Sequence, residues 1–377
     1  STLVTANINA LLTSQIQPIT TSQVVALRTV QIIALTTTNV PVLLTSQINI
    51  LSSAQVGAFE TRQIVVLTTI QIPAITTANI LTLSTDQIVS VLTSQAVALS
   101  TAQIVALLTT QVSSLLTSQV EVLLTTQVDV LLTAQTYVLN STQIQSLTTI
   151  QIPALRTANI SSLTTMNIAS LLTSQIIVLL PPQITSFTTA QIVVLKSEQV
   201  QTLNSRQVNA ITTLNISTLL TSQINFLYTS QVNILLTSQI ASLLSVQTSI
   251  LKTDQIISLT TIQIPAITTL NINTLTTDQT DALLTSQVYV LTTEQIVAIN
   301  TAQINEMSSD QLNAMTTIPV IAIETVDVQS ITNVNVSTLL TSQINVLTTA
   351  EAVALTTAQI QSLTTIQIPA ITTLDIN

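Results

Sequence analysis

The chain has 377 residues, of which 47% are hydrophobic and only 6% are charged, and its formal net charge is −9 at pH 7. It contains no cysteine or histidine, which excludes disulfide bonds and thiolate or imidazole metal sites. An acidic chain with three tyrosines and three phenylalanines offers nucleic acid neither a basic surface nor a stacking platform, so no nucleic-acid partner is expected.

One eight-residue sequence motif repeats along the whole chain without insertion or deletion. It is plainest over residues 101–135, where TAQIVALLTTQVSSLLTSQVEVLLTTQVDVLLTAQ places a glutamine at every eighth position. In steps of eight from Asn7 to Asp375 there are 47 register positions. A strict short period predicts a repeat array. We therefore expect one continuous octapeptide-repeat solenoid over residues 1–377, either a segment of a longer array or a fibre subunit.

The eight positions differ in how much they vary, and we number them from the glutamine as position zero. Position −4 is always apolar, position +1 is nearly always Ile or Val, and position +3 is mostly small or β-branched. Position −2 is Thr or Ser except at Pro181 and Asn333. Position zero is Gln or Asn except at Pro319, Asp327, Glu351 and Asp375. Positions −3, −1 and +2 vary and carry most charges. We therefore predict that the constrained positions, Thr at −2 included, lie in the interior.

Two folds could produce this pattern. A continuous α-helix cannot, because its faces would drift by about 80° per octad. One short helix per octad would use position −3 as N-cap, glutamine as N3, and the apolar −4 and +1 residues as a hydrophobic staple. However, the hydroxyl is constrained at −2 and not at −3, where Leu108 and Leu116 stand. Proline also recurs at +2, for example at Pro73 and Pro153, inside such a helix.

The sequence is instead interpreted as an all-β fold, a single-domain β-solenoid, with the compact α-solenoid as the alternative. Residues −4, −2 and zero would share a strand face, and Thr and Gln would form ladders between rungs. The near-absence of glycine is the main objection, because tight corners favour positive φ. We expect each rung to hold a whole number of octads, either two or three. Local ladder breaks are expected at Pro181–Pro182 and around Pro319, Asp327 and Glu351.

No residue pattern indicates catalysis, and the chain is not expected to be an enzyme or to bind a cofactor or metal. Asp278 and Asp281 are close in sequence but lack a His, Cys or basic partner, which predicts a solvated face. No apolar run is long enough to span a membrane. Asn-x-Ser/Thr sequences are explained by chance in a chain so rich in Thr and Ser; they occur at Asn140, Asn159, Asn215 and Asn335.

The outward positions carry many apolar residues, with Leu at −3 and Val or Ile at +2. Monomers rarely expose so much apolar surface. This indicates lateral packing between copies, and bare solenoid ends would also favour end-to-end association.

The phrases LTTAQIQSLTTIQI (355–368) and IETVDVQSIT (323–332) resemble the LTTxQI-type octapeptide-repeat arrays of very large bacterial surface or secreted proteins, notably in alphaproteobacteria. The resemblance implies an extracellular or cell-surface structural role, such as a filament, sheath or adhesin stalk, and supplies no catalytic residue. The alternative is a binding module whose regular face recognises a polymer, a surface or ice.

Overall fold

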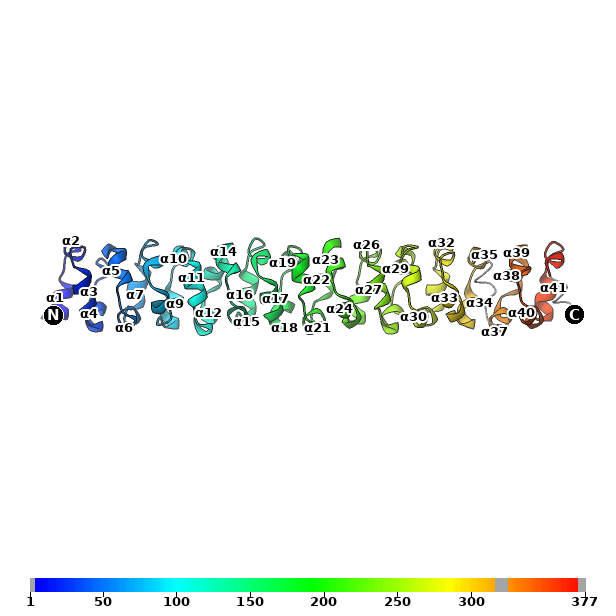
Figure 1. Ribbon diagram of the computed structural model, residues 1–377, viewed down its shortest axis with the longest axis horizontal. Helices are drawn as coiled ribbons and strands as arrows, with labels where there is room; N and C mark the ends of the chain where they lie inside the picture. The colour runs from blue at the N-terminus through cyan, green and yellow to red at the C-terminus, as the bar shows by residue number, and fades with distance from the viewer. Residues whose placement is uncertain (1–3, 316–324, 372–377) are drawn as a thin grey trace. The chain divides into compact units, whose positions relative to one another are not determined.

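The computed structural model describes residues 4–315 and 325–371, and within these ranges every regular element is a short helix and none is a strand (Figure 1). The expected all-β β-solenoid is therefore wrong, and the alternative of one short helix per octad is confirmed. The chain divides into two compact units, Ser1–Val194 and Leu195–Asn377, which are described separately.

In the first unit each octad contributes one α-helix of four to six residues or one 3-10 helix of three. The α-helices are α1 (Thr5–Asn9), α2 (Thr13–Ile16), α3 (Thr21–Val25), α4 (Thr29–Ile33), α5 (Thr45–Asn49), α6 (Ser53–Gly57), α7 (Thr61–Val65), α8 (Thr77–Ile80), α9 (Thr85–Ser90), α10 (Thr93–Ala98), α11 (Thr101–Ala106), α12 (Thr109–Ser114), α13 (Thr117–Glu121), α14 (Thr125–Asp129), α15 (Thr133–Tyr137), α16 (Ser141–Ser146), α17 (Thr157–Ser162), α18 (Thr165–Ser170), α19 (Thr173–Ile176), α20 (Pro181–Thr185) and α21 (Thr189–Ile192). The 3-10 helices are η1 (Val40–Val42), η2 (Ile72–Ala74) and η3 (Ile152–Ala154).

The second unit repeats the same element. Its α-helices are α22 (Ser197–Thr202), α23 (Ser205–Ala210), α24 (Thr213–Thr218), α25 (Thr221–Asn225), α26 (Thr229–Val232), α27 (Thr237–Ala241), α28 (Ser245–Thr248), α29 (Thr253–Ser258), α30 (Thr269–Asn273), α31 (Thr277–Asp281), α32 (Thr285–Val288), α33 (Thr293–Ala298), α34 (Thr301–Glu306), α35 (Ser309–Ala314), α37 (Thr325–Ser330), α38 (Asn333–Thr338), α39 (Thr341–Ile344), α40 (Thr349–Ala354) and α41 (Thr357–Ser362). Its 3-10 helices are η4 (Ile264–Ala266) and η5 (Ile368–Ala370).

Helix α14 shows how one octad folds. Its N-cap, Leu124, has extended backbone angles (φ −68°, ψ 152°), and its carbonyl oxygen accepts from the N–H groups of Gln127 and Val128, both at 2.9 Å. The apolar residues at −4 and +1, Leu123 and Val128, flank this turn and are buried, as in a hydrophobic staple. The +1 residue is at most 4% exposed at every described register position from Ile8 to Ile344. Burial of each such side chain is worth about 1.5–3 kcal/mol.

The glutamine at position zero caps its own helix. In α14, the N–H of Leu124 donates to Gln127 Oε1 at 2.7 Å, which satisfies a backbone donor before the first turn. A Ser, Thr or Asn at −3 completes a reciprocal capping box; Ser100, for example, accepts from the N–H of Gln103 at 3.2 Å. Because glutamine supplies the common half of this arrangement, Leu is tolerated at −3. A hydroxyl at −3 is therefore not required for helix formation, so its frequent absence does not count against helices.

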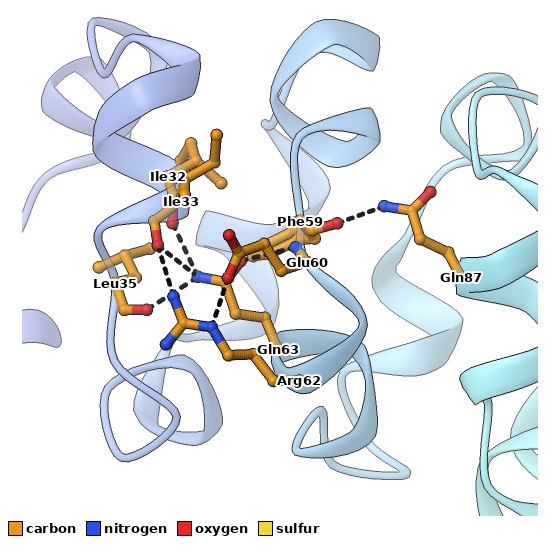
Figure 2. A network of polar contacts seen from close by, with 8 residues as sticks. All are labelled: Ile32, Ile33, Leu35, Phe59, Glu60, Arg62, Gln63 and Gln87. Carbon is orange, nitrogen blue, oxygen red and sulfur yellow. Dashed lines mark hydrogen bonds and ion pairs between the residues drawn. The ribbon is translucent and has the colours of Figure 1, made fainter.

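The amide nitrogen of the same glutamine joins neighbouring turns of the solenoid. Figure 2 shows Gln63, whose Nε2 donates to the carbonyl oxygens of Ile32 and Leu35, both at 2.8 Å, while its Oε1 accepts from the N–H of Glu60. We call this arrangement the glutamine clamp: one side chain bonds the N-cap three residues earlier and carbonyls 28 and 31 residues earlier. Gln and Asn at position zero are at most 4% exposed from Gln31 to Gln311, so their predicted burial is confirmed. Their predicted ladders of like side chains are wrong, because the partners are backbone groups.

The clamp also fixes the length of a turn. Hydrogen bonds between adjacent turns link residues 25 to 31 positions apart, as in Asn49 Nδ2 to the carbonyl of Ala74 and Gln63 Nε2 to that of Ile32. Helices pack most closely on those three octads away, for example α13 on α16. A turn therefore holds between three and four octads. The expectation of a whole number of octads per rung, whether two or three, is wrong.

The hydroxyl at position −2 lies on the surface, so its predicted burial is wrong. Thr101, Thr109 and Thr117, for example, are exposed. This residue is the first of the helix and lies beside position zero three octads later. At three asparagines in position zero a serine hydroxyl donates to the amide oxygen, as Ser53 Oγ does to Asn79 Oδ1 at 3.0 Å. The shorter amide then reaches a single carbonyl, that of Leu51, 28 residues earlier at 2.7 Å.

Proline at +2 is accommodated because the octad forms a 3-10 helix in place of an α-helix. In η2, Pro73 follows Ile72, and the turn tightens so that the N–H of Ala74 donates to the carbonyl of Gln71 at 3.0 Å. Gln71 keeps its clamp to the carbonyls of Val40 and Leu43. Because the helix is only one turn long, proline does not interrupt an extended series of backbone hydrogen bonds.

The pair Pro181–Pro182 occupies the first helical positions of α20, where no intrahelical donor is needed. Gln183 still reaches the carbonyls of Ile152 and Leu155, so the break expected there does not occur. The positions around Pro319 lie outside the described residues.

Candidate functional site

The surface of each unit is formed by positions −3, −1 and +2, as predicted, together with −2. Position −3 of one octad lies beside position +2 four octads earlier. This is shown by Arg156, whose Nε and Nη2 donate to the two carboxylate oxygens of Asp129, each at 3.0 Å, across 27 residues. The hydrogen bond from Arg156 lowers the pKa of Asp129 below its usual value. Asn300 Nδ2 likewise donates to the carbonyl of Asn273 across the same interval.

Apolar residues occupy these paired surface positions in the first unit. We define the apolar belt as the +2 residues and the −3 leucines that follow them by 27 positions. Each member is between 36% and 47% exposed. The pairs are Val65 with Leu92, Leu81 with Leu108, Val89 with Leu116, Val97 with Leu124, and Val105 with Leu132. The last four pairs come from successive octads. Because a turn holds more than three octads, the belt faces several directions around the solenoid.

Among the described residues of the second unit, an apolar +2 residue and the −3 leucine 27 positions later are both exposed at Ile257 (44%) and Leu284 (46%). Separate apolar residues protrude further at position −1 of four proline-containing octads: Ile70, Ile150, Ile262 and Ile366 are 74–75% exposed. They stand singly, which is ordinary for a protein surface.

Asp278 and Asp281, the carboxylates considered from the sequence, are both exposed on α31, which confirms the predicted solvated face. Asn159, Asn215 and Asn335 are buried and serve as position-zero amides, so these three are not accessible acceptors; Asn140 is the exposed N-cap of α16. Asp327 and Glu351 are buried, at 7% and 3% exposure, where the other octads carry an amide.

One open hollow of about 420 Å³ contains charged side chains, between α7 and α9 in the first unit. Its lining includes Glu60, Arg62 and Asp86. Arg62 Nε donates to Glu60, and Arg62 Nη2 donates to the carbonyl of Ile33 at 3.4 Å. The guanidinium group therefore already has hydrogen-bond partners within the protein (Figure 2). The hollow holds no nucleophile paired with a base, and we assign it no chemistry.

Within residues 4–315 and 325–371, no group of three or more His, Cys, Asp or Glu side chains is placed to hold a metal ion. No helix of the described ranges has both the length and the apolar character needed to cross a membrane.

Comparison with known proteins matches residues 289–317 to the ALTTAQ repeat family. The chain is a repeat-containing protein. The matched stretch covers less than a tenth of the sequence and contains α33, α34 and α35, which share the octad geometry described above. A search of curated proteins found no match.

Proposed function

We propose that this chain is a structural repeat protein that associates laterally and end to end in an extracellular filament, sheath or adhesin stalk. The octad arrays of very large bacterial surface and secreted proteins, which the sequence resembles, support the extracellular location. The apolar belt is the observation that carries the proposal. A monomer gains nothing from ten half-exposed aliphatic side chains arranged in adjacent pairs, whereas copies packed side by side would bury them.

The clamp supports a mechanical role. In the described octads with glutamine at position zero, one buried side chain generally bonds its own helix and the preceding turn, so neighbouring turns are held together by repeated polar links as well as by apolar packing. Separating two turns would expose the carbonyl acceptors and the Ile and Leu core together. Such a solenoid is suited to bearing load along a chain.

The belt is tested by the triple variant Leu108→Thr, Leu116→Thr and Leu124→Thr. Threonine already occupies position −3 elsewhere, for example at Thr148, so the fold should be retained. The parent chain should form bundles in electron micrographs and show a concentration-dependent mass in light scattering. The variant should remain as single particles at concentrations about tenfold higher, because the buried apolar area per contact falls.

The matched control is Thr110→Ala, Ser118→Ala and Thr126→Ala, which changes three exposed −1 residues of the same octads. It should associate like the parent. A parent chain that stays monomeric, or a belt variant that bundles like the control, would contradict the proposal. Discrete particles that bind along an added polymer would instead support the binding-module alternative.

A further inference from the structure

The apolar belt encircles one stretch of the first unit. All five pairs fall within residues 65–132, which is between two and three turns of the solenoid, since side chains that meet on adjacent turns are 25 to 27 residues apart. The octads before and after the belt carry small or polar pairs at the same two positions: Gly57 with Ser84 before it, and Ser113 with Asn140 and Glu121 with Thr148 after it. The belt is therefore a ring at one level of the unit and not a stripe along it.

The pairs, each named here by its leucine, face different sides of the solenoid. Eight residues turn the chain by roughly 110° around the solenoid, because a turn holds a little more than three octads. The Leu116 and Leu124 pairs, from successive octads, therefore face two sides. Leu108 and Leu132 are the N-caps of α12 and α15, which pack on one another, so these two pairs share a third side. The Leu92 pair, two octads before the Leu108 pair, faces between the Leu116 and Leu124 sides.

A ring of this kind fits several neighbouring copies better than one flat partner. A flat surface or a single polymer would contact one side and leave the other pairs exposed. One pair offers on the order of 100 Å² of apolar surface, far below the roughly 800 Å² that each partner of a stable interface buries. A single contact is thus too small for a stable dimer, whereas several neighbours bound at once reinforce one another.

The distribution of charge also favours contact between identical belts. Residues 87–120, which contain most of the belt, have no charged side chain. The second unit, Leu195–Asn377, carries three basic and eleven acidic residues. Copies of this chain therefore repel one another through their second units but not through the belt.

We infer that copies of this chain meet belt to belt, aligned at the level of residues 65–132, with neighbours on three sides of each first unit. The inference rests on the proposed lateral association and adds to it the partner surface, the register and the number of neighbours.

The register is tested by cross-linking full-length chains, which have no cysteine of their own. Ser118→Cys places an exposed thiol within the belt, and Ser22→Cys places one several turns before it. In bundles of the two variants mixed equally, a short bismaleimide should join two Ser118→Cys chains at least about tenfold more often than it joins a Ser118→Cys chain to a Ser22→Cys chain.

The sides are tested by two variants with equal numbers of substitutions. Leu92→Thr with Leu116→Thr and Leu124→Thr leaves the Leu108 and Leu132 pairs, which face one side. Leu92→Thr with Leu108→Thr and Leu132→Thr leaves the Leu116 and Leu124 pairs on two sides. At about thirtyfold the concentration at which the parent bundles, the first variant should form particles no larger than pairs, and the second should form extended rows in electron micrographs.

Particles of equal size from the two variants would overturn the inference, because the amount of apolar surface and not its arrangement would then govern association. Mixed cross-links as frequent as those between two Ser118→Cys chains would also overturn it, because the copies would then have no fixed register. A parent that stays monomeric contradicts the proposed function as well. A parent that bundles but gives either of the first two results contradicts the inference alone.

Discussion

Replacement of Gln111 by alanine should lower the free energy of local unfolding around α12 by about 3–5 kcal/mol. Gln111 Nε2 donates to the carbonyls of Ile80 and Leu83, both at 2.8 Å, and its Oε1 accepts from the N–H of Leu108 at 2.8 Å. Alanine would leave these three backbone groups without the amide in a site that is 1% exposed, and would open a cavity. Native-state hydrogen exchange measures the effect on the flanking octads.

Two matched variants separate the clamp from general disturbance. Gln111→Asn keeps a donor for the carbonyl 28 residues earlier, as Asn79 does, and should cost about 1–2 kcal/mol. Thr110→Ala changes the exposed neighbouring residue and should cost no more than about 0.5 kcal/mol. If Gln111→Ala is no more harmful than Thr110→Ala, the clamp does not hold the turns together.

Deletion of one whole octad should preserve the fold, whereas deletion of seven residues should disrupt it. If residues 109–116 are removed, Gln119, Gln127 and Gln135 can still donate to backbone carbonyls 28 and 31 residues earlier. The residues that then occupy these two positions are the equivalent residues of the preceding octad. Gln135, for example, would exchange the carbonyls of Ile104 and Leu107 for those of Ala96 and Leu99. Removal of residues 109–115 shifts every clamp that spans the site by one residue.

The expected results differ strongly. The eight-residue deletion should change the unfolding free energy by no more than the loss of one repeat, in line with an additive repeat array. The seven-residue deletion removes about three clamps and should cost about 10 kcal/mol locally, which would unfold the neighbouring turns. Urea unfolding and proteolysis distinguish these outcomes. Equal damage by both deletions would contradict a screw arrangement that repeats at every octad.

The register and most of the core could be predicted from the sequence, but the choice between strand and helix could not be made correctly. Residues at −4, zero and +1 are buried as predicted, because an invariant apolar or amide position indicates an interior environment in either fold. Leu, and not a hydroxyl, often stands at −3, and this pattern favours strands over capped helices. A side chain three residues into the helix can, however, cap it alone, as Gln127 does for Leu124.

One further signal favours the helical fold. The chain has one glycine, and no described residue has a positive φ, so the near-absence of glycine, an objection to tight strand corners, agrees with the observed backbone. Octads three apart are side by side where a serine at −2 contacts an asparagine at zero 26 residues later, as at Ser53 with Asn79 and Ser245 with Asn271.

The candidate site was harder to predict than the core. The outward apolar columns were recognised, but their pairing across 27 residues depends on the turn length, which was expected to be two or three whole octads. The apolar belt can therefore be recognised only once it is known that position +2 lies beside position −3 of the octad four repeats later.

An engineered disulfide tests whether the turns of this helical solenoid meet 25 to 31 residues apart. Thr136 Oγ1 and Ser162 Oγ lie 2.9 Å apart on adjacent turns, 26 residues apart in sequence. The chain has no cysteine of its own, so Thr136→Cys with Ser162→Cys gives a single pair. This pair should oxidise nearly completely in the folded monomer, as judged by peptide mapping. Ala134→Cys with Ile150→Cys, two exposed positions two octads apart, should stay reduced in the monomer; the opposite result would contradict turns that meet 25 to 31 residues apart.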